Sequence, residues 1–293
     1  MVKTSIAAAT ISSVAIALTL SSCKPHPSEA SLPQTGQPIP EVAQAIAQQP
    51  RQTAPATVGI FPDLSGSMTS ARVAPLKFED FQVVFESLQQ TGGTIAFGAI
   101  CDRSNRPLVR VTFPQPPRLE PSQFNNPVKP EDPNSKRGNP FKKKKGKAEY
   151  EQHLQVYEQK STQDRQTLAN FQQRFATLKK ENQAQIAAIK PQVVAILNHP
   201  RNCRATDIQS AIQRANLLFQ EPNSSFNQPP RRFAVFITDG LDTFSSQAAR
   251  LSADKVLLVN GTPSVGIFQT IPHSRFESPQ TAVNNLSNAI GQP

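Results

Sequence analysis

The fold is decided by a short stretch near the start of the chain, residues 57–67, which read TVGIFPDLSGS. Residues 57–61 form a short apolar run that ends at a turn signal, and such a run is typical of a buried strand. Pro62 and Asp63 close the run, and a polar turn follows. Because proline has no N–H to donate, one interpretation is that Pro62 ends the strand early and displaces Asp63.

Strands and helices are expected to alternate outward from this stretch. Apolar residues at helical spacing predict a helix over residues 76–88, which Gly92 and Gly93 would end. Strands are expected at residues 94–100 and 108–113. Further elements expected near the C-terminus are a helix over 208–218, strands at 233–237, 256–259 and 265–268, and a helix over 282–290. This alternation predicts the α/β class, with a Rossmann-like open sheet and helices on both faces.

The α/β pattern is interrupted by an insertion, residues 114–200. Residues 114–140 are rich in proline and basic residues and are expected to form a poorly ordered loop. From Tyr150 onward, apolar residues recur at alternating steps of three and four, which predicts a long coiled-coil-like arm, either one helix or a hairpin. Pro191 is expected to break or kink it. Polar residues interrupt the apolar seam at Ser161, Asp164 and Asn182.

The composition limits the class of protein. The chain has 293 residues, which allows one or two domains, and a net charge of +10. Its 37% hydrophobic residues are too few for a polytopic membrane protein, and its 18% charged residues are too few for a wholly disordered chain. The basic surplus gathers at residues 103–147, which suits either a solvated loop or contact with anionic lipids or acidic wall polymers.

The N-terminus is expected to be a targeting signal. Residues 1–22 have Lys3 followed by an apolar run that is short for a membrane span, as in a secretory signal peptide. The sequence Leu-Ser-Ser-Cys at residues 20–23 resembles a bacterial lipobox, which implies cleavage before Cys23 and acylation of that residue, with palmitate-like chains. The alternative is an ordinary signal peptide with an incidental cysteine.

A lipid-anchored chain needs a connection to its folded part. Residues 23–54 are rich in proline and are expected to form an extended tether, with a short helix possible over residues 42–49. Several acyl chains hold a protein stably at a bilayer. The expected location is therefore the bacterial cell envelope, on the periplasmic or extracellular face of a membrane, and nucleic acid is not an expected partner.

Three separate pieces of the sequence carry oxygen ligands where strands end or helices begin. Asp63, Ser65 and Ser67 follow the first strand, Thr206 precedes a helix, and Asp239 follows the strand at residues 233–237. In an open α/β sheet, loops at the carboxyl ends of strands meet in one crevice. Carboxylate and hydroxyl oxygens are hard ligands, which suit Mg²⁺, Mn²⁺ or Ca²⁺.

These pieces, in this order, resemble the von Willebrand factor A (vWA) domain with its metal-ion-dependent adhesion site. That site uses Asp-x-Ser-x-Ser, a threonine on a later loop and an aspartate after the fourth strand. The matching residues are Asp63, Ser65, Ser67, Thr206 and Asp239. The resemblance covers residues 55–113 and 201–290. It implies a vWA-type fold, a bound Mg²⁺ (or Mn²⁺ or Ca²⁺), and a protein partner that offers an Asp or Glu carboxylate to the ion.

Two cysteines remain once Cys23 is assigned to the lipid anchor. If the family's topology holds, Cys101 and Cys203 both lie on the metal side of the sheet, where a disulfide would pin the Thr206 loop. An exported protein is in a compartment that permits this bond. Two reduced, buried thiols are the alternative.

The functional hypothesis is a membrane-anchored envelope lipoprotein that binds a protein partner through a divalent cation. The alternative is a structural envelope scaffold that acts through its helical insertion, with a vestigial metal site. An enzyme is not expected, because no nucleophile–base pair can be assigned and the sequence has no phosphate loop, nucleophile elbow or zinc motif. The oligomeric state and the identity of the partner stay open.

Overall fold

The computed structural model describes most of the chain after the N-terminal region. The described residues are 36, 38–49, 53–70, 73–102, 104–132, 140–222, 226–243, 250–261 and 266–292, with the backbone alone for 70 and 140–146. The predicted signal peptide, Cys23 and the first part of the predicted tether lie outside them.

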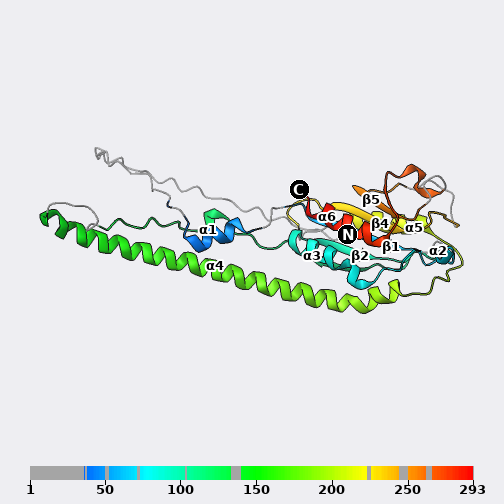
Figure 1. Cartoon of the computed structure of the whole chain (residues 1–293), viewed down its shortest axis with the longest axis horizontal. Helices are drawn as coiled ribbons and strands as arrows, with labels where there is room; N and C mark the ends of the chain where they lie inside the picture. The colour runs from blue at the N-terminus through cyan, green and yellow to red at the C-terminus, as the bar shows by residue number, and fades with distance from the viewer. Residues whose placement is uncertain are drawn as a thin grey trace, which may run out of the picture. The chain divides into compact units, whose positions relative to one another are not determined.

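Six strands form one sheet in the order β3-β2-β1-β4-β5-β6. Figure 1 labels β1, β2, β4 and β5 of this sheet. The strands are β1 (Ala56–Pro62), β2 (Gly93–Phe97), β3 (Val109–Phe113), β4 (Arg231–Ile237), β5 (Lys255–Val259) and β6 (Ser274–Phe276). Neighbours pair in parallel, except that β3 runs antiparallel to β2 at one edge. Every residue of β1 and β2 is buried, as expected of central parallel strands covered on both faces.

Helices cover both faces of this sheet, so the predicted α/β class is confirmed. The helices are α1 (Pro40–Ala47), α2 (Ser67–Ser70), α3 (Gln82–Thr91), α4 (Pro140–Leu197), α5 (Ile208–Gln220) and α6 (Pro279–Gly291), with short 3₁₀ turns η1 (Phe78–Phe81), η2 (Pro121–Gln123) and η4 (Ile267–Thr270). On one face, α3, α6 and the end of α4 share a core with alternate residues of β1 and β4. On the other face, α5 and η4 pack against the remaining residues of the same strands.

The ends of these helices follow from local sequence. Asp207 caps α5, because its side chain accepts a hydrogen bond from the backbone N–H of Ser210. Ser278 caps α6 in the same way, and Pro279 supplies the first turn. Gly92, with φ of 78°, ends α3 in a backbone conformation that side chains with a Cβ rarely adopt.

The insertion contains one continuous helix of 58 residues, α4. The structure thus shows a single helix and no hairpin, and α4 runs on through Pro191, where a break or kink was predicted. Val193, which is fully buried, packs in the core beside the sheet. Earlier in α4, Leu168 belongs to a buried apolar cluster with Val42 of α1, which lies within the predicted tether.

The segment before α4 differs from its prediction as a poorly ordered loop. Its described part lacks regular structure apart from η2, yet Leu119 and Phe124 are buried against α1 and α4. One of the polar residues that interrupt the apolar seam of α4 also forms hydrogen bonds with this segment. The Asp164 carboxylate accepts hydrogen bonds from the backbone N–H of Asn125 at 2.9 Å and from its side-chain amide at 2.8 Å.

Two predictions about strands are wrong. A strand was predicted at residues 265–268, but the described part of that segment enters the 3₁₀ turn η4, and the sixth strand is β6. Pro62 does not end β1 early, since β1 pairs with β4 up to the register Pro62–Ile237.

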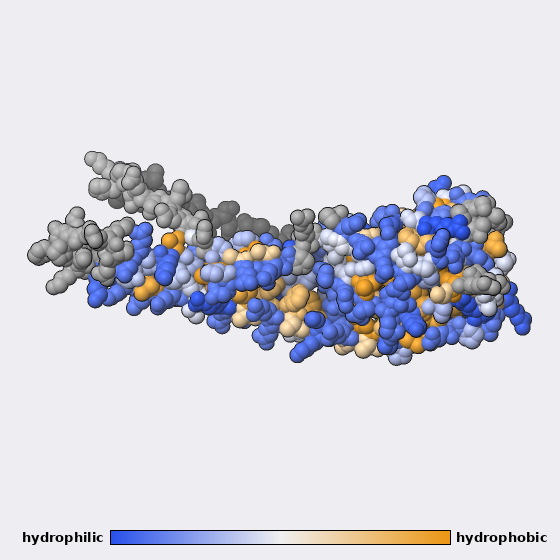
Figure 2. All heavy atoms as spheres, viewed as in Figure 1, coloured by the Kyte–Doolittle hydropathy of each residue, from blue (hydrophilic) through white to orange (hydrophobic). Residues whose placement is uncertain are grey.

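Within the part of the chain that the structure describes, no helix is long and apolar enough to cross a membrane. The face seen in Figure 2 is largely hydrophilic, with apolar residues in scattered groups.

Candidate metal-binding site

The sheet topology creates a crevice after β1 and β4. These strands are neighbours, but the chain continues from β1 toward β2 on one side and from β4 toward β5 on the other. Their following loops therefore diverge, and such a switch point is where open α/β sheets bind ligands. Asp63 follows β1 directly, and Asp239 lies two residues after β4.

The Asp63 carboxylate is held from both strands. The backbone N–H of Asp63 donates to the Ile237 carbonyl at 2.9 Å, which extends the β1–β4 ladder by one residue. One carboxylate oxygen accepts from the backbone N–H of Ser65 at 2.8 Å, and the other accepts from the Thr238 hydroxyl at 2.7 Å. The residue is only 2% exposed, so its position is fixed by the core.

Burial raises the pKa of the Asp63 carboxyl above its ordinary value of 3.8. Hydrogen bonds from Thr238 and Ser65 oppose this rise, while the nearby charge of Asp239 adds to it. No ion pair joins Asp63 to a basic side chain among the described residues. A divalent cation would therefore stabilise the ionised form of this buried carboxylate, which has a second carboxylate close by.

Two hydroxyl groups lie beside this carboxylate. The Oγ atoms of Ser65 and Ser67 are 3.0 Å apart. Ser65 is buried, whereas Ser67 is exposed at the start of α2. Ser65 is held from a second direction, because its backbone forms a parallel bridge with Cys203.

Hydrogen bonds join the loop that contains Thr206 to the loop that follows β4. Thr206 is buried, and its backbone N–H donates to the Thr243 hydroxyl at 2.8 Å. The Thr243 N–H in turn donates to the Thr206 carbonyl at 3.0 Å. Asp239 is half-buried and accepts from the backbone N–H of Leu241 at 3.1 Å. These contacts place the last two predicted ligands on adjoining loops.

The five predicted ligands are thus brought together to different degrees. Hydrogen bonds link Asp63, Ser65 and Ser67, and the charge of Asp239 acts on Asp63. The hydrogen bonds of Thr206 described above are made with Thr243 and not with another predicted ligand. The set offers two carboxylates and three hydroxyls, which are all hard oxygen donors and fit Mg²⁺, Mn²⁺ or Ca²⁺.

Sequence reasoning assigned no supporting role to Thr238, and for Asp102 and Asp242 it favoured solvated loop carboxylates over acceptors that support the site. Thr238 donates to Asp63 and also accepts from the backbone N–H of Gly240 at 3.1 Å, so it links β1 to the loop after β4. Asp102 and Asp242 accept from the backbone N–H groups of Ala205 and Gln209, at 2.8 and 3.0 Å. The available signal was position, because Thr238 follows β4 directly and Asp102 and Asp242 lie in the loops after β2 and β4.

A disulfide joins two loops at this edge of the sheet. Cys101 and Cys203 are bonded, with an S–S distance of 2.01 Å. Cys101 and Cys203 also cluster with Asp102 in a group that resembles a metal site, but the disulfide leaves no free thiolate there. The Cys101 carbonyl also accepts from the Asp207 N–H at 3.2 Å, so hydrogen bonds as well as the disulfide attach the loop after β2 to the Thr206 loop.

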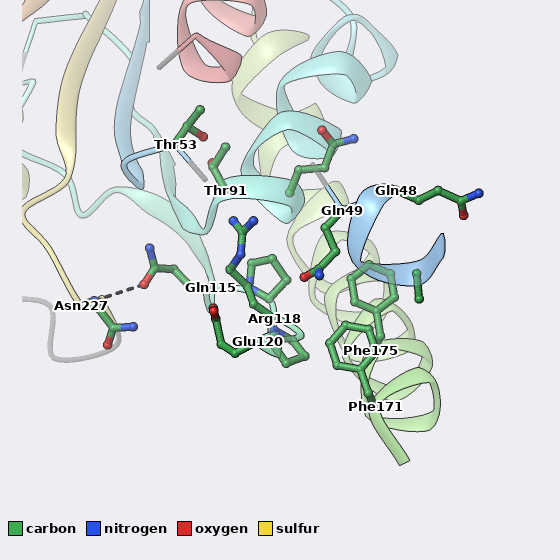
Figure 3. Close-up of a pocket in the computed structure, with 14 residues that line it drawn as sticks. Gln48, Gln49, Thr53, Thr91, Gln115, Arg118, Glu120, Phe171, Phe175 and Asn227 are labelled. Atoms are coloured by element: carbon green, nitrogen blue, oxygen red, sulfur yellow. Dashed lines mark hydrogen bonds between the residues drawn. The ribbon is translucent and has the colours of Figure 1, made fainter. Parts of the chain in front are cut away.

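A hollow of about 500 Å³ lies apart from these residues, at the amino-terminal edge of the parallel strands (Figure 3). Thr53, Thr91 and Gln115 line it beside the strand ends, and Phe171 and Phe175 line it from α4. The two phenyl rings stack with centroids 6.2 Å apart. Since none of the five predicted ligands lines this hollow, it is separate from the candidate metal site.

Comparison with known proteins gives only distant likenesses. No family model and no curated protein matches the chain. The pilus adhesin SpaC from Lactobacillus rhamnosus GG, in its open conformation, is similar in structure at 10% identity and a TM-score of 0.37, over 83% of this chain and 31% of that chain. Proximal thread matrix protein 1 from the mussel byssus is similar at 10% identity and a TM-score of 0.32, over 82% and 48%. The chain thus spans less than half the length of either protein, and likenesses this weak carry no argument.

Proposed function

We propose that this protein is a lipid-anchored protein of the bacterial cell envelope, with a vWA-type domain that binds a protein partner through a divalent cation. The cation would be held by Asp63, Ser65, Ser67, Thr206 and Asp239. The single observation that carries the proposal is the buried Asp63 carboxylate, which lies at the switch point of the sheet beside the paired hydroxyls of Ser65 and Ser67.

The donor set favours an ion that is still able to bind a further ligand. Hydroxyl groups are neutral, so a set rich in hydroxyls cancels less of the charge of a divalent ion than a set of carboxylates would. The bound ion would attract a carboxylate, and an Asp or Glu side chain of a partner is the expected source. The loops around Thr206 and Asp239 flank this position and are held to each other through Thr243.

The electrostatics of Asp63 support the same proposal. Its carboxyl is buried and has a raised pKa, so ionisation without a counter-charge is unfavourable. A divalent ion supplies that counter-charge and competes with the proton for the same oxygens. Cation affinity should therefore fall as the pH is lowered toward the pKa of Asp63.

The second candidate function is a structural scaffold that acts through α4. Two observations favour it: Val156 and Phe175 on α4 are 44% and 46% exposed, and Phe175 lines the hollow in Figure 3. This function would need no cation, so partner binding would persist in a chelator.

The experiment that tests the proposal is capture of envelope proteins by the immobilised full-length protein, in Mg²⁺ and in EDTA. We expect specific capture in Mg²⁺ that is lost in EDTA and in the variant Ser65→Ala/Ser67→Ala. Ser274→Ala removes an exposed hydroxyl from β6 and should behave as the unmodified protein does. Equal capture in EDTA and by the double variant would contradict the proposal and favour the scaffold.

A further inference from the structure

A second hollow lies directly beside the candidate metal site. It has a volume of about 610 Å³, and its lining includes Leu64 and Cys203. Leu64 lies between two of the predicted metal ligands, and the N–H of Cys203 donates to the Leu64 carbonyl at 3.1 Å. The hollow, which we call the basic pocket, therefore adjoins the metal site on the side of the disulfide.

Arg214 of α5 is the least exposed arginine of the basic pocket. Its guanidinium lies 5.7 Å from the centre of the Phe61 ring and donates to the carbonyls of Arg106 at 2.7 Å and Ala99 at 2.9 Å. Burial lowers the pKa of Arg214 to about 10, and the charge of Asp207 opposes this shift only in part. Within the described residues, Arg214 forms no ion pair and its Nε atom has no hydrogen-bond partner. Its positive charge is therefore compensated mainly by carbonyl dipoles.

Further positive charge lies at the rim of the pocket. Arg106 and Arg204 line it, are exposed, and make no side-chain hydrogen bond or ion pair with any residue that the structure describes. The acidic residue of the lining, Asp102, already accepts a hydrogen bond from the backbone N–H of Ala205. The described lining contains three guanidinium groups and one carboxylate, so the pocket carries a positive surplus that nothing in this lining cancels.

The rest of the lining is suited to an organic ligand. Pro107, Val109, Ala195 and Ile196 provide an apolar wall. A simple inorganic anion would gain nothing from such a wall, and no Phe or Tyr among the described residues lines the pocket to stack against a nucleic acid base. Guanidinium groups bind carboxylates through paired hydrogen bonds, and an apolar side chain next to the carboxylate would bury surface against the wall.

We propose that the basic pocket binds an acidic peptide segment in which carboxylate side chains alternate with apolar ones. We further infer that this segment belongs to the partner whose carboxylate reaches the cation, and this second part rests on the proposed function. The basic pocket itself does not require a metal ion, so the two parts can be tested separately.

The test is fluorescence anisotropy of a labelled hexapeptide, Leu-Glu-Val-Glu-Leu-Glu, with the full-length protein in EDTA at low salt. We expect it to bind about tenfold or more tightly than Leu-Gln-Val-Gln-Leu-Gln, because only the acidic peptide pairs with the guanidinium groups. Arg106→Gln/Arg204→Gln should weaken binding about tenfold. The matched control Arg174→Gln/Arg275→Gln removes two exposed arginines elsewhere and gives the same net charge.

Three results would overturn the basic pocket as a peptide site. The first is an equal loss of binding in both double variants, which would indicate non-specific attraction to a basic protein. The second is equal binding of the two peptides. The third is displacement of the acidic peptide by inorganic pyrophosphate as efficiently as by unlabelled peptide, which would identify an inorganic oxyanion site.

Addition of Mg²⁺ tests the link to the cation. If one partner segment uses both sites, Mg²⁺ should tighten binding of the acidic peptide, and Ser65→Ala/Ser67→Ala should remove that gain. If peptide binding in EDTA depends on the basic pocket but Mg²⁺ does not tighten it, the link to the cation is contradicted. The basic pocket would then still be supported as a peptide site. Such a result separates failure of the cation-dependent function from failure of the pocket.

Discussion

Replacing Cys101 and Cys203 by serine should lower the free energy of unfolding by about 2–5 kcal/mol. The two cysteines are 102 residues apart in the sequence, so their bond closes a long loop that contains all of α4. The loss of unfolded-chain entropy for a loop of this length is about 16 cal/mol/K, which corresponds to about 4.7 kcal/mol at 25 °C. This figure is the upper end of the expected range, because unfolded chains already contain some residual structure.

The assay is urea unfolding of the full-length protein followed by far-ultraviolet circular dichroism. A Cys23→Ser background removes the third cysteine, so that Cys101 and Cys203 are the cysteines that remain. Reduction of this background protein should destabilise it by the same amount as the double serine substitution does. A loss below about 1 kcal/mol in both experiments would refute the reasoning, since native disulfides that close long loops contribute more than this.

Three further perturbations test other parts of the structure. Because burial raises the pKa of Asp63, the folded state binds the Asp63 proton more tightly than the unfolded state does. This difference stabilises the folded state fully below about pH 3.8, and the stabilisation is lost as the pH rises through the pKa of the folded state. Without divalent ions, stability should therefore fall relative to that of Asp63→Asn as the pH rises through this window, by at most about 1.4 kcal/mol per pH unit; parallel pH profiles would contradict this. Asp164→Ala should cost about 1 kcal/mol and speed hydrogen exchange at the Asn125 amide, whereas Asp164→Asn should preserve protection; unchanged exchange in both variants would be inconsistent with the bond. Leu168→Ala should speed exchange throughout α1, because a helix of eight residues depends on docking, and the prediction is wrong if protection at Val42 is unaffected.

The central strands could be predicted because burial on both faces makes them short, continuous apolar runs. The stretch at residues 57–61 and the run at 233–237 are of this kind. β6 could not be found in this way, because Ser274 and Arg275 are exposed and only backbone pairing with β5 defines the strand. Buried side chains are visible in a sequence pattern, whereas ladder hydrogen bonds are not.

The insertion was harder to predict because its structure depends on distant contacts. The sequence around Pro191 suggested a break, yet Val193 beyond it is anchored in the core and α4 continues. The irregular segment before α4 contains Leu119 and Phe124, which are buried only because α1 and α4 lie against them. Local propensity does not carry this information.

For the candidate site, the motif indicated candidate donors but not the role of Thr238. Asp63, Ser65 and Ser67 are near neighbours in sequence, so their proximity follows from a tight turn. The bond from Thr238 to Asp63 depends on the register between β1 and β4, which a single sequence does not reveal. The positive surplus of the basic pocket likewise arises from residues that only the fold brings together.

The most direct test of the central claim is titration of Mn²⁺ and Mg²⁺ into the full-length protein, with bound ion measured by calorimetry and by equilibrium dialysis. We predict saturable binding of one ion per chain that is lost in Asp63→Asn and retained in Ser274→Ala, with both variants folded by circular dichroism. Asparagine keeps an oxygen that can accept from the Ser65 N–H, so loss of binding would report the missing charge and not a disrupted turn. Saturable binding that Asp63→Asn leaves unchanged, or a folded unmodified protein that binds no ion by either method, would contradict the claim.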